Sequence, residues 1–219
     1  MSALLAGLTV LIIGDSHMSN PDYLITTLHD DLMNKGAVVY SFGACGVAAG
    51  DWMVKSQSSC GGATRIKDGP IEVKTGQEAM TRPFNELVKT YKPNLVVVVN
   101  ADTMASYSAP ELPKTWIWQQ VSRLTKGVKN NGVACAWVGP AWGTEGGVFN
   151  KTFARAKEMS GYLSEIVAPC VYIDSQKMSK PGEWGTIDGQ HLDGVGYKNW
   201  GAAIGNAISS PSVLNTIKR

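Results

Sequence analysis

The sequence predicts an α/β protein, a three-layer α/β/α sandwich whose central sheet has about five parallel strands. Short apolar runs alternate with amphipathic stretches of helical spacing along the 219 residues, and the joints between them are short. Polar, glycine-containing motifs follow directly after several of the apolar runs. Alternation of this kind places parallel strands side by side with helices on both faces of the sheet. We interpret residues 1–219 as one domain.

The predicted strands are short apolar runs, several of them rich in β-branched residues. The first, LTVLIIGD at 8–15, ends in turn residues. The third, NLVVVVNAD at 94–102, contains four consecutive valines, which suit a central strand buried on both faces. The remaining strands are predicted at 37–43, 133–141 and 170–176.

The helices are predicted where apolar residues recur with a helical period between these runs. The first begins at Asn20 and Pro21 and ends at Lys35 and Gly36. Further helices are predicted at about 81–91, 113–130 and 149–167, with a last one after Gly194.

A polar, glycine-rich segment at 47–79 has no clear period, and we expect an inserted loop or excursion there. Cys45 and Cys60 flank its Gly/Ser-rich part, and the sequence leaves open whether they form a disulfide. Such a bridge would indicate an oxidising compartment, so a secreted or periplasmic location is favoured over a cytoplasmic one. Cys135 and Cys170 open two apolar runs and are interpreted as plain buried thiols.

Composition argues against several classes of partner. The formal net charge is +2 and the basic residues are scattered, which does not match a nucleic-acid-binding face. No apolar run approaches the roughly 18 residues of a membrane span, and 4–13 is interpreted as a buried strand rather than a signal peptide. The cysteines and histidines lack metal-ligand spacing, so no metal site is expected. Nothing in the sequence indicates an oligomeric state.

The motif Gly14-Asp15-Ser16-His17 follows the first predicted strand. A serine on a tight turn that enters a helix exposes its hydroxyl, and its backbone N–H lies where negative charge is favoured. These are the properties of a nucleophile that also donates to an oxyanion. The alternative is that Asp15 and Ser16 only cap the helix.

The motif Asp188-Gly-Gln-His191 lies near the end of the chain. An imidazole is well matched to removing a proton from a hydroxyl near neutral pH, and a carboxylate beside it fixes its tautomer. The alternative is a loop histidine with a chance acidic neighbour. Of the other histidines, His17 is expected to line the pocket or lie at the surface, and His29 to be exposed on its helix.

Together the two motifs resemble the SGNH (GDSL-type) hydrolase superfamily over nearly the whole chain, and HLDGVGY at 191–197 is similar to its HLxxxGY pattern. The resemblance implies a flavodoxin-like strand order and acyl transfer that needs no metal or organic cofactor. It also implies that Ser16 is the nucleophile, His191 the base and Asp188 the residue that orients the base.

The resemblance further implies an oxyanion hole. A glycine after the second strand supplies one amide, and Gly46 is the best match, with Gly43 second. The family's GxND block reads Asn100-Ala101-Asp102-Thr103 here, so Asp102 stands in the asparagine position. Because an ionised carboxylate would repel an oxyanion, we expect Asn100 to be the side-chain donor through a local shift. Asp102 would then accept hydrogen bonds from loop amides.

The expected substrate is a small-molecule or carbohydrate ester that carries a short acyl group such as acetyl. Trp142 and Trp184 lie in glycine-rich loops near the expected site and suit stacking on a sugar ring, although packing is the alternative. A second hypothesis is a polysaccharide O-acetyltransferase with the same triad, which the GDSH form and the altered third block favour. A third is a catalytically inactive SGNH-like binding module.

Overall fold

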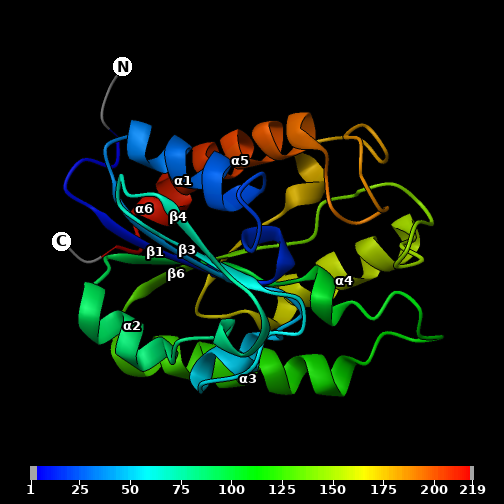
Figure 1. Ribbon diagram of the computed structural model, residues 1–219, viewed down its shortest axis with the longest axis horizontal. Coiled ribbons are helices and arrows are strands. Elements are labelled where there is room, and N and C mark those ends of the chain that lie inside the picture. The colour runs from blue at the N-terminus through cyan, green and yellow to red at the C-terminus, as the bar shows by residue number, and fades with distance from the viewer. Residues whose placement is uncertain (1–3, 218–219) are drawn as a thin grey trace.

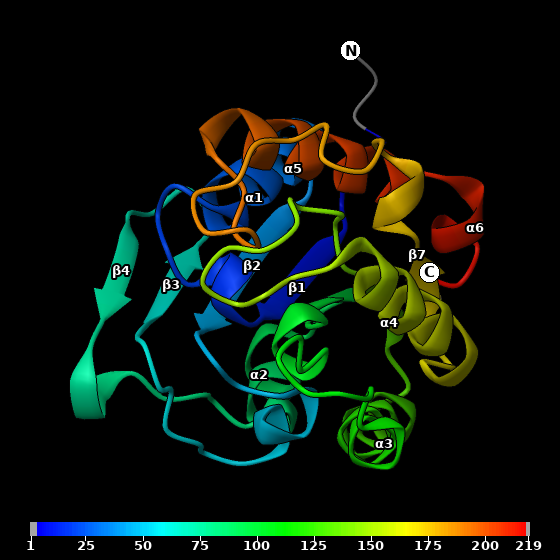
Figure 2. The ribbon, with the colours of Figure 1, turned by 90° about the vertical axis from the view of Figure 1, so that its right-hand side faces the viewer.

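The structure is a computed structural model that describes residues 4–217, and its centre is a seven-stranded sheet (Figure 1). The strand order is β4-β3-β2-β1-β5-β6-β7, with β4 and β3 at one edge and β7 at the other (Figure 2). The five strands β2, β1, β5, β6 and β7 are parallel to their neighbours in this series, whereas β3 pairs antiparallel with both β2 and β4. The strands are β1 (Thr9–Gly14), β2 (Val38–Ala44), β3 (Gly62–Ile66), β4 (Ile71–Lys74), β5 (Leu95–Val99), β6 (Ala134–Val138) and β7 (Val171–Ile173).

Helices cover both faces of the sheet, as predicted. The α-helices are α1 (Leu24–Asn34), α2 (Phe84–Tyr91), α3 (Lys114–Asn131), α4 (Phe153–Ile166), α5 (Gly194–Ile208) and α6 (Pro211–Leu214). Figure 1 shows α1 and α5 side by side above the sheet, with α2 and α3 below it. Without β3 and β4 the parallel strands follow the flavodoxin-like order 2-1-3-4-5, which confirms the predicted fold class. Among residues 4–217, no helix is long and apolar enough to cross a membrane.

The central strand β1 separates two apolar clusters because successive side chains of a strand point to opposite faces. Val10 and Ile12 pack into the cluster that contains residues of α1 and α5. Leu11 and Ile13 pack into the cluster that contains residues of α2, α3 and α4. Burial on both sides fixes the register of β1, and therefore the height at which the turn after it begins.

The segment 47–79, expected to be a loop or excursion, instead extends the sheet. It contains the antiparallel strands β3 and β4 and the short 3-10 helices Ala49–Met53 and Gly76–Glu78. The outer strand β4 is largely exposed, so its sequence lacks the apolar run by which the parallel strands were predicted. Cys45 and Cys60 form a disulfide that joins the end of β2 to the residues before β3.

Cys135 and Cys170 also form a disulfide, so their interpretation as plain thiols was wrong. This bridge links β6 to the residue before β7, and both half-cystines are buried. No local spacing indicates the pairing, because it depends on two strands that are neighbours only in the folded sheet.

His29 was expected to be exposed but is fully buried between α1 and the sheet. One ring nitrogen lies 2.7 Å from Ser41 Oγ, and the other lies 2.8 Å from the carbonyl oxygen of Lys67. Burial lowers the pKa of His29 to about 4. The inner face of α1 therefore carries a polar side chain whose ring nitrogens find hydrogen-bond partners in β2 and in the turn after β3.

Removal of the inner disulfide is expected to destabilise the fold without touching the edge of the sheet where the site lies. The double variant Cys135→Ala/Cys170→Ala should lose about 2–4 kcal/mol of unfolding free energy, because the unfolded chain gains freedom when this crosslink is absent. Urea denaturation followed by circular dichroism measures the change. An unchanged midpoint in non-reducing buffer would contradict it.

Candidate active site

Ser16 lies in the turn that follows the central strand β1. Gly14 ends the strand where a Cβ atom would approach the carbonyl oxygen of Val99 to 2.7 Å, so the chain passes close to β5. Ser16 begins a short 3-10 helix, Ser16–Met18, and Asp15 caps it by accepting a hydrogen bond from the His17 backbone N–H at 3.2 Å. The sequence thus places the serine hydroxyl at the carboxyl end of the sheet.

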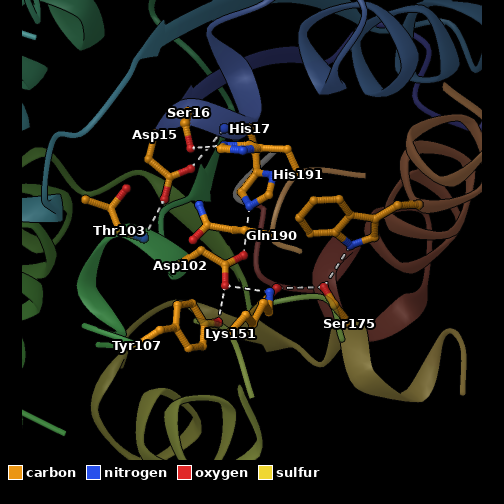
Figure 3. A network of polar contacts seen from close by, with 12 residues as sticks. Asp15, Ser16, His17, Asp102, Thr103, Tyr107, Lys151, Ser175, Gln190 and His191 are labelled. Atoms are coloured by element: carbon orange, nitrogen blue, oxygen red, sulfur yellow. Dashed lines mark hydrogen bonds and ion pairs between the residues drawn. The ribbon is translucent and has the colours of Figure 1, made fainter. Parts of the chain in front are cut away.

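His191 and Asp188 lie in the loop that precedes α5. One Asp188 carboxylate oxygen accepts the backbone N–H groups of Gln190 at 3.0 Å and His191 at 2.7 Å. The other oxygen lies 2.6 Å from Nδ1 of His191. On the far side of the ring, Nε2 lies 2.7 Å from Ser16 Oγ (Figure 3). The structure therefore brings together all three residues that the resemblance assigns to a triad.

The electrostatic surroundings favour the neutral form of the His191 ring. Burial, followed by the nearby His17, holds the pKa of His191 below its ordinary value, although Asp188 works in the opposite direction. Burial would raise the pKa of Asp188, but the hydrogen bonds from the His191 ring and backbone outweigh it and keep that pKa low. A carboxylate at Nδ1 requires the proton there, so Nε2 is free to accept the serine proton.

A cavity of about 410 Å³ opens over Ser16 and His191. Gly46 lines it with φ of +79°, and a Cβ atom there would collide with the Ser59 side chain. Gly43, the second candidate, lies instead within β2 beneath Met18. The remaining lining residues are Cys45, Ser59, Cys60, Asp102, Thr103, Ser106, Tyr107, Ser108, Ala109, Phe149 and Gln190.

Asn100 is not placed to be the side-chain donor that we expected. Its side chain is fully buried, and Nδ2 donates to the carbonyl oxygen of Val47 at 2.9 Å. Asn100 is absent from the cavity wall. Its amide links the end of β5 to the segment after β2, and the local shift that would turn it toward Ser16 does not occur.

Asp102 does line the cavity, but it accepts hydrogen bonds from side chains rather than from loop amides. One oxygen lies 2.7 Å from Nε2 of His17, and the other accepts from Lys151 Nζ at 2.8 Å and from the Tyr107 hydroxyl (Figure 3). The second nitrogen of the His17 ring is 2.8 Å from the Tyr197 hydroxyl. His17 is therefore part of a buried network and not a surface residue.

The surroundings of the Asp102 carboxyl favour its ionised form. Burial alone would raise the pKa of Asp102, but the ammonium group of Lys151 and the hydrogen bond from His17 hold it well below its ordinary value. The side chains of Lys151 and Asp102 both have 0% of their surface exposed. Tyr107 and Lys151 were missed by the sequence analysis, since neither belongs to a motif and Lys151 comes from a loop 49 residues away.

Trp142 packs away from the cavity. Its indole N–H donates to the carbonyl oxygens of Gln176 and Ser179 at 3.0 and 3.1 Å, and its ring meets Phe153 edge-on. Neither Trp142 nor Trp184 lines the cavity, so the packing alternative holds for both. The aromatic ring beside the site is that of Phe149, which lies edge-on to His191.

Within the part of the chain that the structure describes, no group of three or more His, Cys, Asp or Glu residues is arranged to hold a metal ion. The arrangement around Ser16 has instead a hydroxyl, a base and an acid in one hydrogen-bonded series. Such a series can transfer an acyl group through a covalent intermediate on the serine.

Three solved structures illustrate which proteins share the fold. An acetyl xylan esterase aligns with a TM-score of 0.61 at 14% identity, covering 92% of this chain and 100% of that one. A GDSL-like lipase from Bacteroides thetaiotaomicron gives 0.59 at 15% identity, covering 91% and 87%. The esterase EstA from Pseudoalteromonas sp. gives 0.55 at 12%, covering 94% and 98%. The proteins that share this fold therefore include SGNH esterases and acyl hydrolases.

At the level of sequence, no protein-family model matches the chain. Protein BcsX from Komagataeibacter xylinus is 42% identical to it over 205 residues, which cover 93% of this chain and 78% of that protein. The chain belongs to the family of Protein BcsX, and it shares its fold with SGNH (GDSL-type) hydrolases.

Proposed function

We propose that this protein is a serine-dependent esterase that removes a short acyl group, such as acetyl, from a carbohydrate. The observation that carries the proposal is the hydrogen-bonded series from Ser16 Oγ through the His191 ring to Asp188. The series faces a cavity large enough for a small ester.

In the proposed reaction, His191 Nε2 takes the proton of Ser16 as Oγ attacks the ester carbonyl carbon. The backbone N–H groups of Ser16 and Gly46 stabilise the negative charge on the carbonyl oxygen. His191 then gives the proton to the departing alcohol, and the acyl group remains on Ser16. Water, deprotonated by the same ring, releases the acid and restores the serine.

The cavity wall supports a polar alcohol as the leaving group. Besides Ser16, five of its residues carry hydroxyl groups, namely Ser59, Thr103, Ser106, Tyr107 and Ser108. Hydroxyl side chains both donate and accept, as sugar hydroxyls do. The acetyl xylan esterase shows that this fold accommodates a carbohydrate ester.

One experiment separates this function from its alternatives. Release of p-nitrophenol from p-nitrophenyl acetate is measured with and without acceptor oligosaccharides, and the acetylated products are identified by mass spectrometry. The proposal expects turnover without an acceptor and deacetylation of acetylated oligosaccharides. Turnover that requires the acceptor indicates an O-acetyltransferase with the same triad. A folded protein that neither turns over the ester nor forms an adduct with a fluorophosphonate probe is a binding module.

The Ser16→Ala variant is expected to lose at least about 10³-fold in kcat/KM toward p-nitrophenyl acetate, because it removes the hydroxyl that is hydrogen-bonded to His191 Nε2. Thermal unfolding checks that the variant is folded. Intact-mass analysis should show one fluorophosphonate adduct on the wild-type chain and none on the variant. Retention of the wild-type rate would remove Ser16 from the mechanism.

On the acid side of the pH profile, kcat/KM should fall as the His191 ring becomes protonated. Only the neutral ring can accept the serine proton, and the pKa of His191 is held below its ordinary 6.5. The rate is therefore expected to be nearly full at neutral pH and to fall as the pH drops through a midpoint below 6.5. A kcat/KM profile toward p-nitrophenyl acetate measures this. A midpoint above the ordinary value would contradict the assigned environment.

A further inference from the structure

The oxyanion hole in the proposed mechanism has two backbone donors but lacks the expected side-chain donor. Asn100 uses its Nδ2 on the carbonyl oxygen of Val47 and does not reach the cavity. Asp102 stands in the asparagine position of the family block, but an ionised carboxylate has no proton to donate. If the oxyanion hole has a third donor, that donor comes from another part of the cavity wall.

Gln190 is a neutral side chain in that wall with a free amide. It lines the same cavity as Ser16 and His191 and has only 5% of its surface exposed. Among residues 4–217, its side chain makes no hydrogen bond, whereas its backbone N–H donates to Asp188. Figure 3 shows the Gln190 side chain extending between Ser16 and Asp102, with the amide nitrogen on the side of Ser16.

The backbone on both sides of Gln190 is held in place. Asp188 binds the N–H groups of Gln190 and His191 together, so the amide-bearing residue and the base share one anchor. The two peptide carbonyls before Gln190 accept N–H groups from the facing loop, Asp188 O from Val148 and Gly189 O from Thr144, both at 3.0 Å. A donor on such a fixed backbone needs little reorganisation when charge develops.

We infer that the Gln190 side-chain amide donates to the oxyanion of the tetrahedral intermediate, and so replaces the asparagine of the family block. The inference rests on the proposed esterase function. The three donors are then the backbone N–H groups of Ser16 and Gly46 and the Gln190 Nε2 group. Gln190 touches the reacting carbonyl oxygen and takes no part in proton transfer.

The neighbouring carboxylate does not oppose this role. Asp102 is neutralised by Lys151 at 2.8 Å and receives further hydrogen bonds from His17 and Tyr107. Both of its oxygens are thus occupied by these partners. The amide of Gln190 keeps both of its N–H groups for the cavity.

Thr103 is a competitor for the role. Its hydroxyl lines the cavity and, like that of Ser106, makes no hydrogen bond among the described residues, while Ser59 and Ser108 donate to the carbonyl oxygens of Cys45 and Phe149. The hydroxyl of Thr103 rotates freely, whereas the Gln190 amide is planar. The comparison of the two residues is therefore the decisive test.

The test uses the full chain and the variants Gln190→Leu, Gln190→Glu and Thr103→Val, with p-nitrophenyl acetate as substrate. Gln190→Leu should lower kcat about 10²-fold with KM changed less than about threefold, because the lost contact forms only in the transition state. Gln190→Glu, which keeps the shape but faces the oxyanion with a carboxylate, should lose at least as much. The loss of kcat in Thr103→Val should be smaller than in either Gln190 variant.

A second readout separates loss of the donor from a structural effect. Affinity for a boronic acid, which forms a tetrahedral adduct on Ser16, should weaken in Gln190→Leu in parallel with kcat/KM. Unfolding temperatures of the three variants show which remain folded, and the near-isosteric Gln190→Glu serves if the leucine variant does not fold.

The inference is overturned if Gln190→Leu or Gln190→Glu keeps kcat within about threefold, or if Thr103→Val loses more than Gln190→Leu. Failure of the proposed function looks different. In that case the wild-type protein itself neither hydrolyses the ester nor forms a fluorophosphonate adduct on Ser16. An active wild type with unaffected Gln190 variants refutes the donor assignment alone.

Discussion

The buried Asp102 carboxylate is the point at which the separate pieces of the site are joined. It forms hydrogen bonds with His17 in the turn after β1, Tyr107 in the segment after β5, and Lys151 in the loop before α4. Removing one partner of a buried ion pair typically costs about 3–5 kcal/mol, since the remaining charge is left without compensation. The loop that supplies Lys151 also donates backbone N–H groups to the carbonyl oxygens of Asp188 and Gly189, so it connects the Asp102 carboxylate to the loop that carries His191.

In the proposed site, anchoring the surrounding segments and donating to the oxyanion fall to different side chains. A carboxylate with three donors is a strong structural anchor but cannot stabilise an oxyanion, while a neutral amide can. The Asn100 amide is used to hold Val47, the residue after Gly46, and so supports the turn in which that glycine reaches φ of +79°. The one uncommitted amide in the cavity wall, within residues 4–217, is that of Gln190.

Much of the fold could be predicted because the parallel strands are continuous apolar runs and the helices between them are amphipathic. The proximity of Ser16, Asp188 and His191 also followed from short motifs placed at strand ends. What could not be predicted depends on contacts between distant segments. The exposed strand β4 has no apolar run, the Cys135–Cys170 bridge joins neighbours in the sheet, and Lys151 reaches Asp102 from a loop without a motif. The prediction for Asn100 was wrong because its position in the chain does not reveal which carbonyl oxygen its side-chain amide will bind.

The balance of charge around His191 explains how one buried ring can serve as a base. Burial and the neighbouring His17, whose ring centre lies 5.1 Å away, disfavour the imidazolium, and Asp188 favours it. The first two effects prevail in the resting state, which leaves Nε2 ready to accept a proton. In the proposed mechanism, the ring becomes charged during attack beside a carboxylate whose own pKa is low, so the proton stays on the imidazole and Asp188 remains ionised. Because His17 is held by Asp102 and Tyr197 on its two nitrogens, it contributes a fixed environment to this balance rather than a second base for Ser16.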